Sequence, residues 1–194
     1  MVYCGIKPEL YVLPRPLVYA VAVLWIVGIT NSFNLIDSMD GLAAGVTFIA
    51  CMTLFLISVS SAKPEAALFS VVLGGSIVGF LRYNFNPAQI FLGDSGALFL
   101  GFSLANFSIV SAVKTSTAIA LLIPVVALGF PIMDTILAMV RRAARALRDG
   151  KGLVASVREI GTADKEHVHH KLMDMGYTQR KAVVVLYGLC LVFG

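Results

Sequence analysis

A row of amides and carboxylates follows the first long apolar stretch of the chain, at a constant spacing of three residues. The row consists of Asn31, Asn34, Asp37 and Asp40, and Gly41 comes directly after it. Side chains three residues apart are neighbours on a helix, so we expect each consecutive pair to share a face. A carboxylate at the centre of a membrane span costs about 2.5–3.5 kcal/mol, so two together suggest a function. The spacing predicts a cation or phosphate site; the structural alternative is a helix running into the polar membrane surface.

A second candidate carboxylate lies in a turn between glycines. The stretch Gly93-Asp94-Ser95-Gly96 follows a loop that contains Pro87, and we expect a helix to begin near Ala97. Glycines let backbone N–H groups approach a ligand, and the N-terminus of a helix favours anions. Asp94 is therefore a candidate ligand for a Mg²⁺ that binds phosphate oxygens. An N-cap role in a turn would explain the same carboxylate without any ligand.

The three histidines, His167, His169 and His170, form a cluster in a basic segment. A zinc site is disfavoured, because no cysteine is near and a pair three residues apart supplies at most two ligands. The many cations nearby favour phosphate binding over a merely solvated loop. Asp134 lies in a later apolar stretch, and a role in the site and a structural role both remain open for it.

The composition is that of an integral membrane protein. Of the 194 residues, 58% are hydrophobic and 13% are charged, whereas soluble domains have roughly 25% charged residues. The net charge is +4, and ten of the 15 basic residues lie between Arg141 and Lys181. This distribution indicates a cytoplasmic segment that faces anionic lipid or a phosphorylated substrate, and it argues against a nucleic-acid surface. The cysteines, at positions 4, 51 and 190, show no metal or redox spacing.

The apolar stretches predict an all-α, polytopic membrane protein with a single membrane domain over residues 1–194. About 20 apolar residues are needed to cross the hydrocarbon layer. A sixth apolar run over residues 182–194 is shorter than that, so we expect a truncated sixth helix. We expect a kink in the fifth span, at Pro124 and at Gly129-Phe130-Pro131. The five predicted spans cover residues 17–36, 42–61, 66–81, 97–113 and 117–140.

The arginines predict the orientation. Arg141, Arg142, Arg145 and Arg148 follow the fifth span directly, which places that end in the cytoplasm. Counting back along the spans, the Asn31–Asp40 row and the loop that precedes Asp94 fall on the same side. Polar stretches selected for their chemistry therefore meet at one membrane face, and we expect a single site open to the cytoplasm.

Four motifs in a fixed order carry a family resemblance: Asn31-x-x-Asn34-x-x-Asp37-x-x-Asp40-Gly-Leu, Ile90-Phe-Leu-Gly-Asp94-Ser-Gly, Phe130-Pro-Ile-Met-Asp134-Thr and His167-Val-His-His-Lys-Leu. The chain resembles the polyprenyl-phosphate N-acetylhexosamine-1-phosphate transferases of glycosyltransferase family 4. The His-x-His-His form is most similar to the undecaprenyl-phosphate GlcNAc-1-phosphate transferases.

The resemblance implies a Mg²⁺-dependent enzyme of the bacterial inner membrane. It would transfer N-acetylglucosamine-1-phosphate, or a related sugar phosphate, from a UDP-N-acetylhexosamine to undecaprenyl phosphate, release UMP and initiate a cell-wall or surface polysaccharide. The resemblance also implies contact with membrane lipid. A homodimer is one possible assembly of such an enzyme. The implied roles are Mg²⁺ ligation by Asn34 and Asp94, catalysis by Asp37, Asp40 and Asp94, and substrate binding by Asn31, Asn34, His167, His169 and His170.

The chain departs from the family pattern in one respect. It contains no Asp-Asp pair, which the family carries in its N-terminal half, and we therefore expect a C-terminal part of a larger transferase. A membrane subunit that needs a partner chain is one alternative. An ion-coupled transporter is the other alternative. Transporters place acids at mid-span and often contain inverted repeats, whereas this sequence shows no repeat and its acids lie mostly at the ends of the spans.

Overall fold

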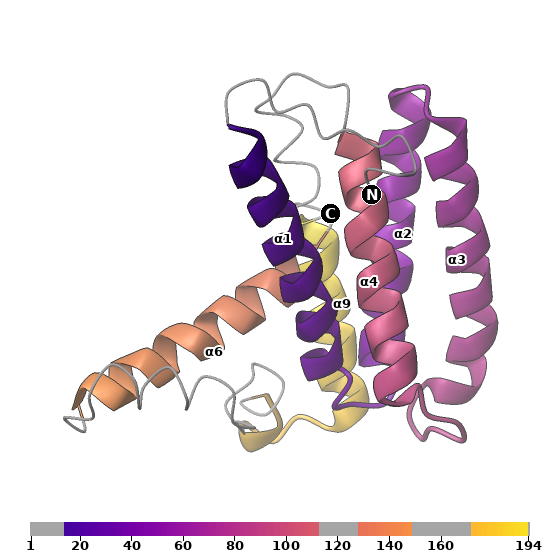
Figure 1. The fold of residues 1–194 in the computed structure, drawn as a ribbon. Helices are drawn as coiled ribbons and strands as arrows, with labels where there is room; N and C mark the ends of the chain where they lie inside the picture. Colours follow the sequence, from indigo (N-terminus) through magenta and orange to yellow (C-terminus); the bar gives the residue numbers. More distant parts are fainter. Residues whose placement is uncertain (1–13, 113–127, 149–171, 194) are drawn as a thin grey trace.

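The protein is a bundle of helices. A computed structural model describes residues 14–112, 128–148 and 172–193, and within these ranges every element is a helix (Figure 1). The elements are α1 (Arg15–Ile36), α2 (Leu42–Ser60), α3 (Pro64–Asn84), α4 (Gly93–Ala112), α6 (Gly129–Arg148) and α9 (Gln179–Phe193).

Five of these helices run alongside one another, and α6 leaves the bundle at a steep angle (Figure 1). The closest neighbours are α2 with α3 and α1 with α4, and α9 lies against α2. In the part of the chain that the structure describes, three helices are long and apolar enough to cross a membrane, over Pro16–Ile36, Leu42–Ser60 and Pro64–Asn84. Leu24, Leu56 and Leu68 on their outer faces are 71%, 63% and 66% exposed, as lipid-facing side chains are. The prediction of a helical membrane protein is confirmed.

Close approach of backbones sets the register between α1 and α4. A Cβ added at Gly101 of α4 would lie 2.8 Å from the Cα of Thr30 and 2.9 Å from the Cβ of Phe33, both on α1. The two helices are antiparallel, so the C-terminal end of α1 lies beside the N-terminal end of α4 (Figure 1). Higher in the pair, Trp25 Nε1 donates a hydrogen bond to Ser108 Oγ at 3.1 Å, which holds the same register.

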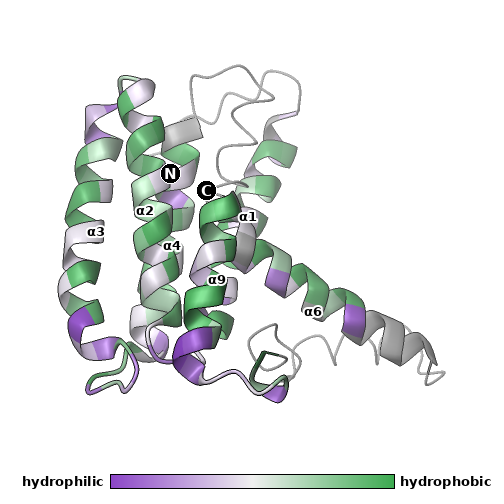
Figure 2. Ribbon diagram, turned by 180° about the vertical axis from the view of Figure 1, so that it is seen from behind, coloured by the Kyte–Doolittle hydropathy of each residue, from purple (hydrophilic) through white to green (hydrophobic). Residues whose placement is uncertain are grey.

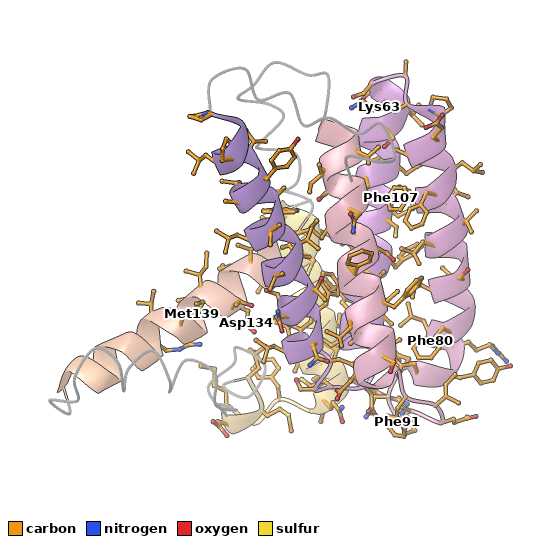
Figure 3. All side chains as sticks on the ribbon, in the orientation of Figure 1. Lys63, Phe80, Phe91, Phe107, Asp134 and Met139 are labelled. Carbon is orange, nitrogen blue, oxygen red and sulfur yellow. The ribbon has the colours of Figure 1, made fainter. Side chains whose placement is uncertain are left out.

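Polar residues gather at one end of the bundle, where α3 ends and α9 begins (Figure 2). The end of α1 and the loop before α4 both lie there, as the sequence predicts. At the opposite end, Lys63 precedes α3 (Figure 3), and its Nζ donates to the carbonyl oxygen of Val110, in the last turn of α4, at 3.2 Å. The positive charge of a lysine at this position interacts favourably with the negative, C-terminal end of the α4 dipole.

The first span ends at Ile36 as predicted, but the polar row does not continue on the same helix: Asp37 is the C-cap of α1 and Asp40 lies in a turn. One predicted helix boundary is wrong. α4 begins at Gly93 and not near Ala97, which puts Asp94 inside its first turn. The turn that interrupts the polar row is held by long-range hydrogen bonds at Asp40 and Gly41, which are described below.

The predicted fifth span is described only in part. Residues 113–127, including the predicted kink at Pro124, lie outside the described ranges. α6 begins at Gly129 and continues through Arg148, so Pro131 lies in its first turn, where a helix tolerates proline. The predicted sixth helix is α9, which packs into the bundle against α2.

Candidate active site

The turn between α1 and α2 is held by side chains from α3 and α9. Gly41 adopts φ +79°, a conformation that glycine reaches without strain. Its N–H donates to Asn84 Oδ1 at 3.1 Å, and its carbonyl oxygen accepts from the Tyr187 hydroxyl at 2.6 Å. Both polar groups of this residue are thus bound by residues distant in sequence, and the preceding acidic segment is fixed in place with it.

Asp40 ties this turn to the loop between α3 and α4. Its Oδ2 accepts a hydrogen bond from Asn86 Nδ2 at 2.9 Å and another from the backbone N–H of Ala88 at 3.1 Å. At the end of α3, Asn84 Nδ2 donates to the carbonyl oxygen of Ile90 in the same loop at 2.9 Å. The carboxylate of Asp40 therefore organises the segment that leads into Asp94.

Asp37 and Asp94 face each other across the ends of α1 and α4. Thr30 packs against Gly101, and seven residues, about two turns, separate Thr30 from Asp37 and Gly101 from Asp94. Because the helices are antiparallel, the same two turns bring the two carboxylates to the same level. In agreement with this proximity, the negative charge of Asp94 contributes to the raised pKa of Asp37.

The pKa of Asp37 is raised to about 6, chiefly because burial disfavours the charged carboxylate and secondly because the negative charge of Asp94 lies near it. A carboxyl group in this state binds a proton at mildly acidic pH. A cation placed between the two carboxylates would oppose both effects. The pair therefore has the electrostatic character of a cation site.

The amide of Asn34 lies one turn before Asp37 on α1. Its Oδ1 is buried and accepts no hydrogen bond from the described residues, although buried carbonyl oxygens are normally paired. Amide and carboxylate oxygens are the ligands that Mg²⁺ prefers, and Mg²⁺ takes only one or two from the protein, the rest coming from water and substrate. The residues present fit the ion.

The remaining predicted site residues are placed as follows. Asn31 is exposed, and its Nδ2 donates to the carbonyl oxygen of Val27 in its own helix at 2.7 Å. Asp134 is 1% exposed, on α6 close to α1 (Figure 3), and next to it Thr135 donates to Ser32 Oγ of α1 at 2.8 Å. The histidines at 167, 169 and 170 lie outside the described residues. The structure thus brings Asn34, Asp37 and Asp94 together, with Asp40 in the adjoining loop network.

Sequence reasoning missed the residues that hold the acids in place. They are three amides, an arginine and a tyrosine on three different elements, and only the polar pair Asn84 and Asn86 in front of a proline gave a local signal. Nothing local marks the others, because their partners lie far away in the chain. The missed residues are Asn84, Asn86, Gln179, Arg180 and Tyr187.

Comparison with known proteins agrees with the motifs. A probable undecaprenyl-phosphate N-acetylglucosaminyl 1-phosphate transferase of Bacillus subtilis (strain 168) is 42% identical over 175 residues, which cover 90% of this chain and 46% of that protein. A decaprenyl-phosphate N-acetylglucosaminephosphotransferase of Mycobacterium leprae (strain TN) is 38% identical over 180 residues, covering 83% of this chain and 42% of that protein. A phospho-N-acetylmuramoyl-pentapeptide-transferase of Chlamydia trachomatis serovar L2 is 49% identical over 86 residues, covering 43% of this chain and 26% of that protein.

The chain spans less than half the length of these relatives. The family assignment rests on a continuous match over residues 4–112, which is more than half of the chain and includes Asn34, Asp37, Asp40 and Asp94. Through that match, the chain belongs to glycosyl transferase family 4.

Proposed function

We propose that the protein to which this chain belongs transfers N-acetylglucosamine-1-phosphate from UDP-N-acetylglucosamine to undecaprenyl phosphate and releases UMP. The names of the B. subtilis and M. leprae relatives support a polyprenyl-phosphate acceptor and an N-acetylglucosamine phosphate donor. The observation that carries the proposal is the pair Asp37 and Asp94, with the unpartnered Oδ1 of Asn34 beside it. This arrangement suits the binding of a cation and a diphosphate.

Asn34 and Asp94 would hold Mg²⁺, and Asp37 lies close enough to share its charge. When bound, the ion would offset the negative charge of the diphosphate as the lipid phosphate attacks. The chain's own part is orientation: the turn after α1 and the start of α4 fix the two carboxylates at one level. Positioning and electrostatic stabilisation of this kind account for most of the catalysis in phosphoryl transfer.

We further propose a plasma-membrane location with the site open to the cytoplasm. The basic segment after residue 141 favours the cytoplasmic side, and the acids lie at one end of the bundle with the loop before α4. UDP-sugars would reach the site from that side. A transporter is disfavoured, because Asp37, Asp40 and Asp94 lie at helix ends and not at mid-span.

A membrane subunit that works only with a partner remains the second candidate, because the chain spans less than half the length of its relatives. Release of UMP from UDP-N-acetylglucosamine tests both proposals, in membranes supplied with undecaprenyl phosphate, with Mg²⁺ or with a chelator. The chain alone and a longer version of its gene are compared. Mg²⁺-dependent release by either supports the transferase, and release only by the longer version means that this chain cannot work alone. A separate partner chain that carries the N-terminal half and restores release would support the partner-dependent subunit. No release by either contradicts the proposed activity.

A further inference from the structure

The side-chain amide of Asn86 joins three elements of the bundle. Its Nδ2 donates to Asp40 Oδ2 at 2.9 Å, in the turn before α2, and to Gln179 Oε1 at 2.8 Å, in the first turn of α9. An amide nitrogen carries two hydrogens, so each acceptor is matched by one donor. Asn86 itself belongs to the loop between α3 and α4. One side chain therefore connects the acidic turn to a helix that follows it by more than 130 residues.

The backbone of Asn86 is bound from the same helix. Its carbonyl oxygen accepts from Arg180 Nε at 2.6 Å. Gln179 and Arg180 are consecutive, so the first turn of α9 binds Asn86 through both the side chain and the main chain. α9 is in turn fixed to the start of α2 by the hydrogen bond from Tyr187 to Gly41.

The loop that these contacts hold leads directly to Asp94. Ala88 N–H donates to the same Asp40 oxygen as Asn86 does, and the N–H of Gln89 donates to the carbonyl oxygen of Tyr83 at 2.8 Å. These bonds fix the middle of the loop, four to seven residues before the start of α4. The position of Asp94 along the bundle axis, relative to Asp37, consequently depends on the hydrogen bonds that join Asp40, Asn86 and Gln179.

We propose that Asn86 is a positioning residue for the transfer reaction, acting by coupling the first turn of α9 to the loop that carries Asp94. This inference rests on the proposed function. Both hydrogens of the Asn86 amide are used by protein acceptors, so its nitrogen has no hydrogen left to donate to a substrate, and we assign its action to Asp40 and the loop. Gln179 shares the role from the other side of the amide.

A double-mutant cycle tests the coupling, because residues that act through one another give non-additive effects. Asn86→Ala is expected to lower kcat by about tenfold, since small misplacements of catalytic groups are costly. Gln179→Ala is expected to lower kcat by about threefold, with KM for the UDP-sugar changed by less than about twofold in both. The double variant is expected to be no slower than Asn86→Ala alone. Gln89→Ala is the matched control, an exposed amide of the same loop, and should keep wild-type kcat.

Hydrogen exchange provides a measurement that does not depend on activity. In the full chain in detergent, Gln179→Ala is expected to increase the exchange of loop amides 85–92 several-fold, as Asn86→Ala does, while Gln89→Ala leaves it unchanged. Effects on kcat that multiply in the double variant would overturn the proposal, and so would a loop whose exchange Gln179→Ala does not alter. If Gln179→Ala alters the exchange of the loop but neither the chain nor its longer version transfers the sugar phosphate, the proposed function and the catalytic part of this role are contradicted. The structural link between α9 and the loop would then still stand.

Discussion

The hydroxyl of Tyr187 donates a hydrogen bond of 2.6 Å to the carbonyl oxygen of Gly41. The bond runs from the middle of α9 to the residue that separates the acidic turn from α2. On the other side of the same residue, Asn84 of α3 accepts from its N–H. The turn that contains Asp37 and Asp40 is therefore held between two helices that flank it, and its geometry depends on both.

Tyr187→Phe should remove this bond while keeping the ring. A hydrogen bond of this type contributes about 1 kcal/mol to stability, so we expect a modest fall in the melting temperature in detergent, together with slower transfer. Tyr177→Phe, at an exposed tyrosine before α9, is the control and should change neither. Equal melting temperatures and equal rates for Tyr187→Phe and wild type would show that the bond does not hold the turn.

Gly45→Ala should disturb the same contact more strongly. A Cβ at this position would overlap the ring and hydroxyl of Tyr187, and overpacking of this kind costs about 1–3 kcal/mol. We expect a clearly lower melting temperature than for Tyr187→Phe. Gly75→Ala on α3 is the matched control, because an added Cβ there meets nothing within 4 Å, and alanine favours a helix over glycine. A Gly45→Ala protein as stable as Gly75→Ala would contradict the packing of α9 on α2.

The sequence allowed the helical bundle and the common end of the polar stretches to be predicted, because both depend on local signals. Apolar runs and the glycine and proline positions set α2 within one residue of its predicted bounds. The family motifs gave Asn34, Asp37, Asp40 and Asp94 as candidates. Their roles as ligands and catalytic groups stay predictions, as do those of the three histidines.

What could not be predicted depends on contacts between residues far apart in the chain. The turn that follows α1 and contains Asp40 is held at Gly41 by Asn84 and Tyr187, and neither partner is visible in the local sequence. Nothing in the sequence around Asp40 indicates that its carboxylate accepts hydrogen bonds from Asn86 and Ala88 in a distant loop. A spacing of three residues predicted a continued helix, and tertiary hydrogen bonds overrode it.

The raised pKa of Asp37, about 6, predicts a pH-dependent stability. The folded state binds this proton more tightly than the unfolded state, whose aspartates titrate near pH ~4, so stability from this group falls as pH rises from about 4 to about 6. In a chelator, Asp37→Asn should therefore melt higher than wild type at pH 7, with the difference shrinking toward pH 4. Mg²⁺ should raise the melting temperature of wild type at pH 7 more than that of Asp37→Asn, which keeps Asn34 and Asp94 but lacks the nearby negative charge. Asp174→Asn, at an exposed carboxylate, is the control; a pH profile of Asp37→Asn parallel to wild type would contradict the assignment.

Asp94→Asn should abolish the Mg²⁺-dependent part of the transfer. Asp94 is exposed in the first turn of α4, so its replacement by an isosteric amide should not disturb packing. Loss of a charged group at a site where charge develops lowers rates on the order of 100-fold. UMP release at a series of Mg²⁺ concentrations measures the effect. Turnover equal to wild type at every concentration would remove Asp94 from the metal site.

Asn34→Leu separates a functional role of this residue from a structural one. Its buried Oδ1 has no hydrogen-bond partner among the described residues, and an unpaired buried polar group costs about 1–3 kcal/mol. Leucine has a similar volume and no polar atom. We therefore expect a melting temperature that is unchanged or higher, with transfer reduced on the order of 100-fold, because a ligand for the cation is lost.

The matched control for Asn34→Leu is Asn106→Leu on α4, since the Nδ2 of Asn106 only donates to the carbonyl oxygen of Phe102 in its own helix, at 2.7 Å. That variant should keep wild-type transfer. A loss of stability in Asn34→Leu that parallels its loss of activity would mean that the amide supports the fold. Full activity would mean that Oδ1 has no part in the chemistry. A stable but inactive protein is the expected result, because an unsatisfied oxygen at the end of α1 destabilises the fold until a cation binds it.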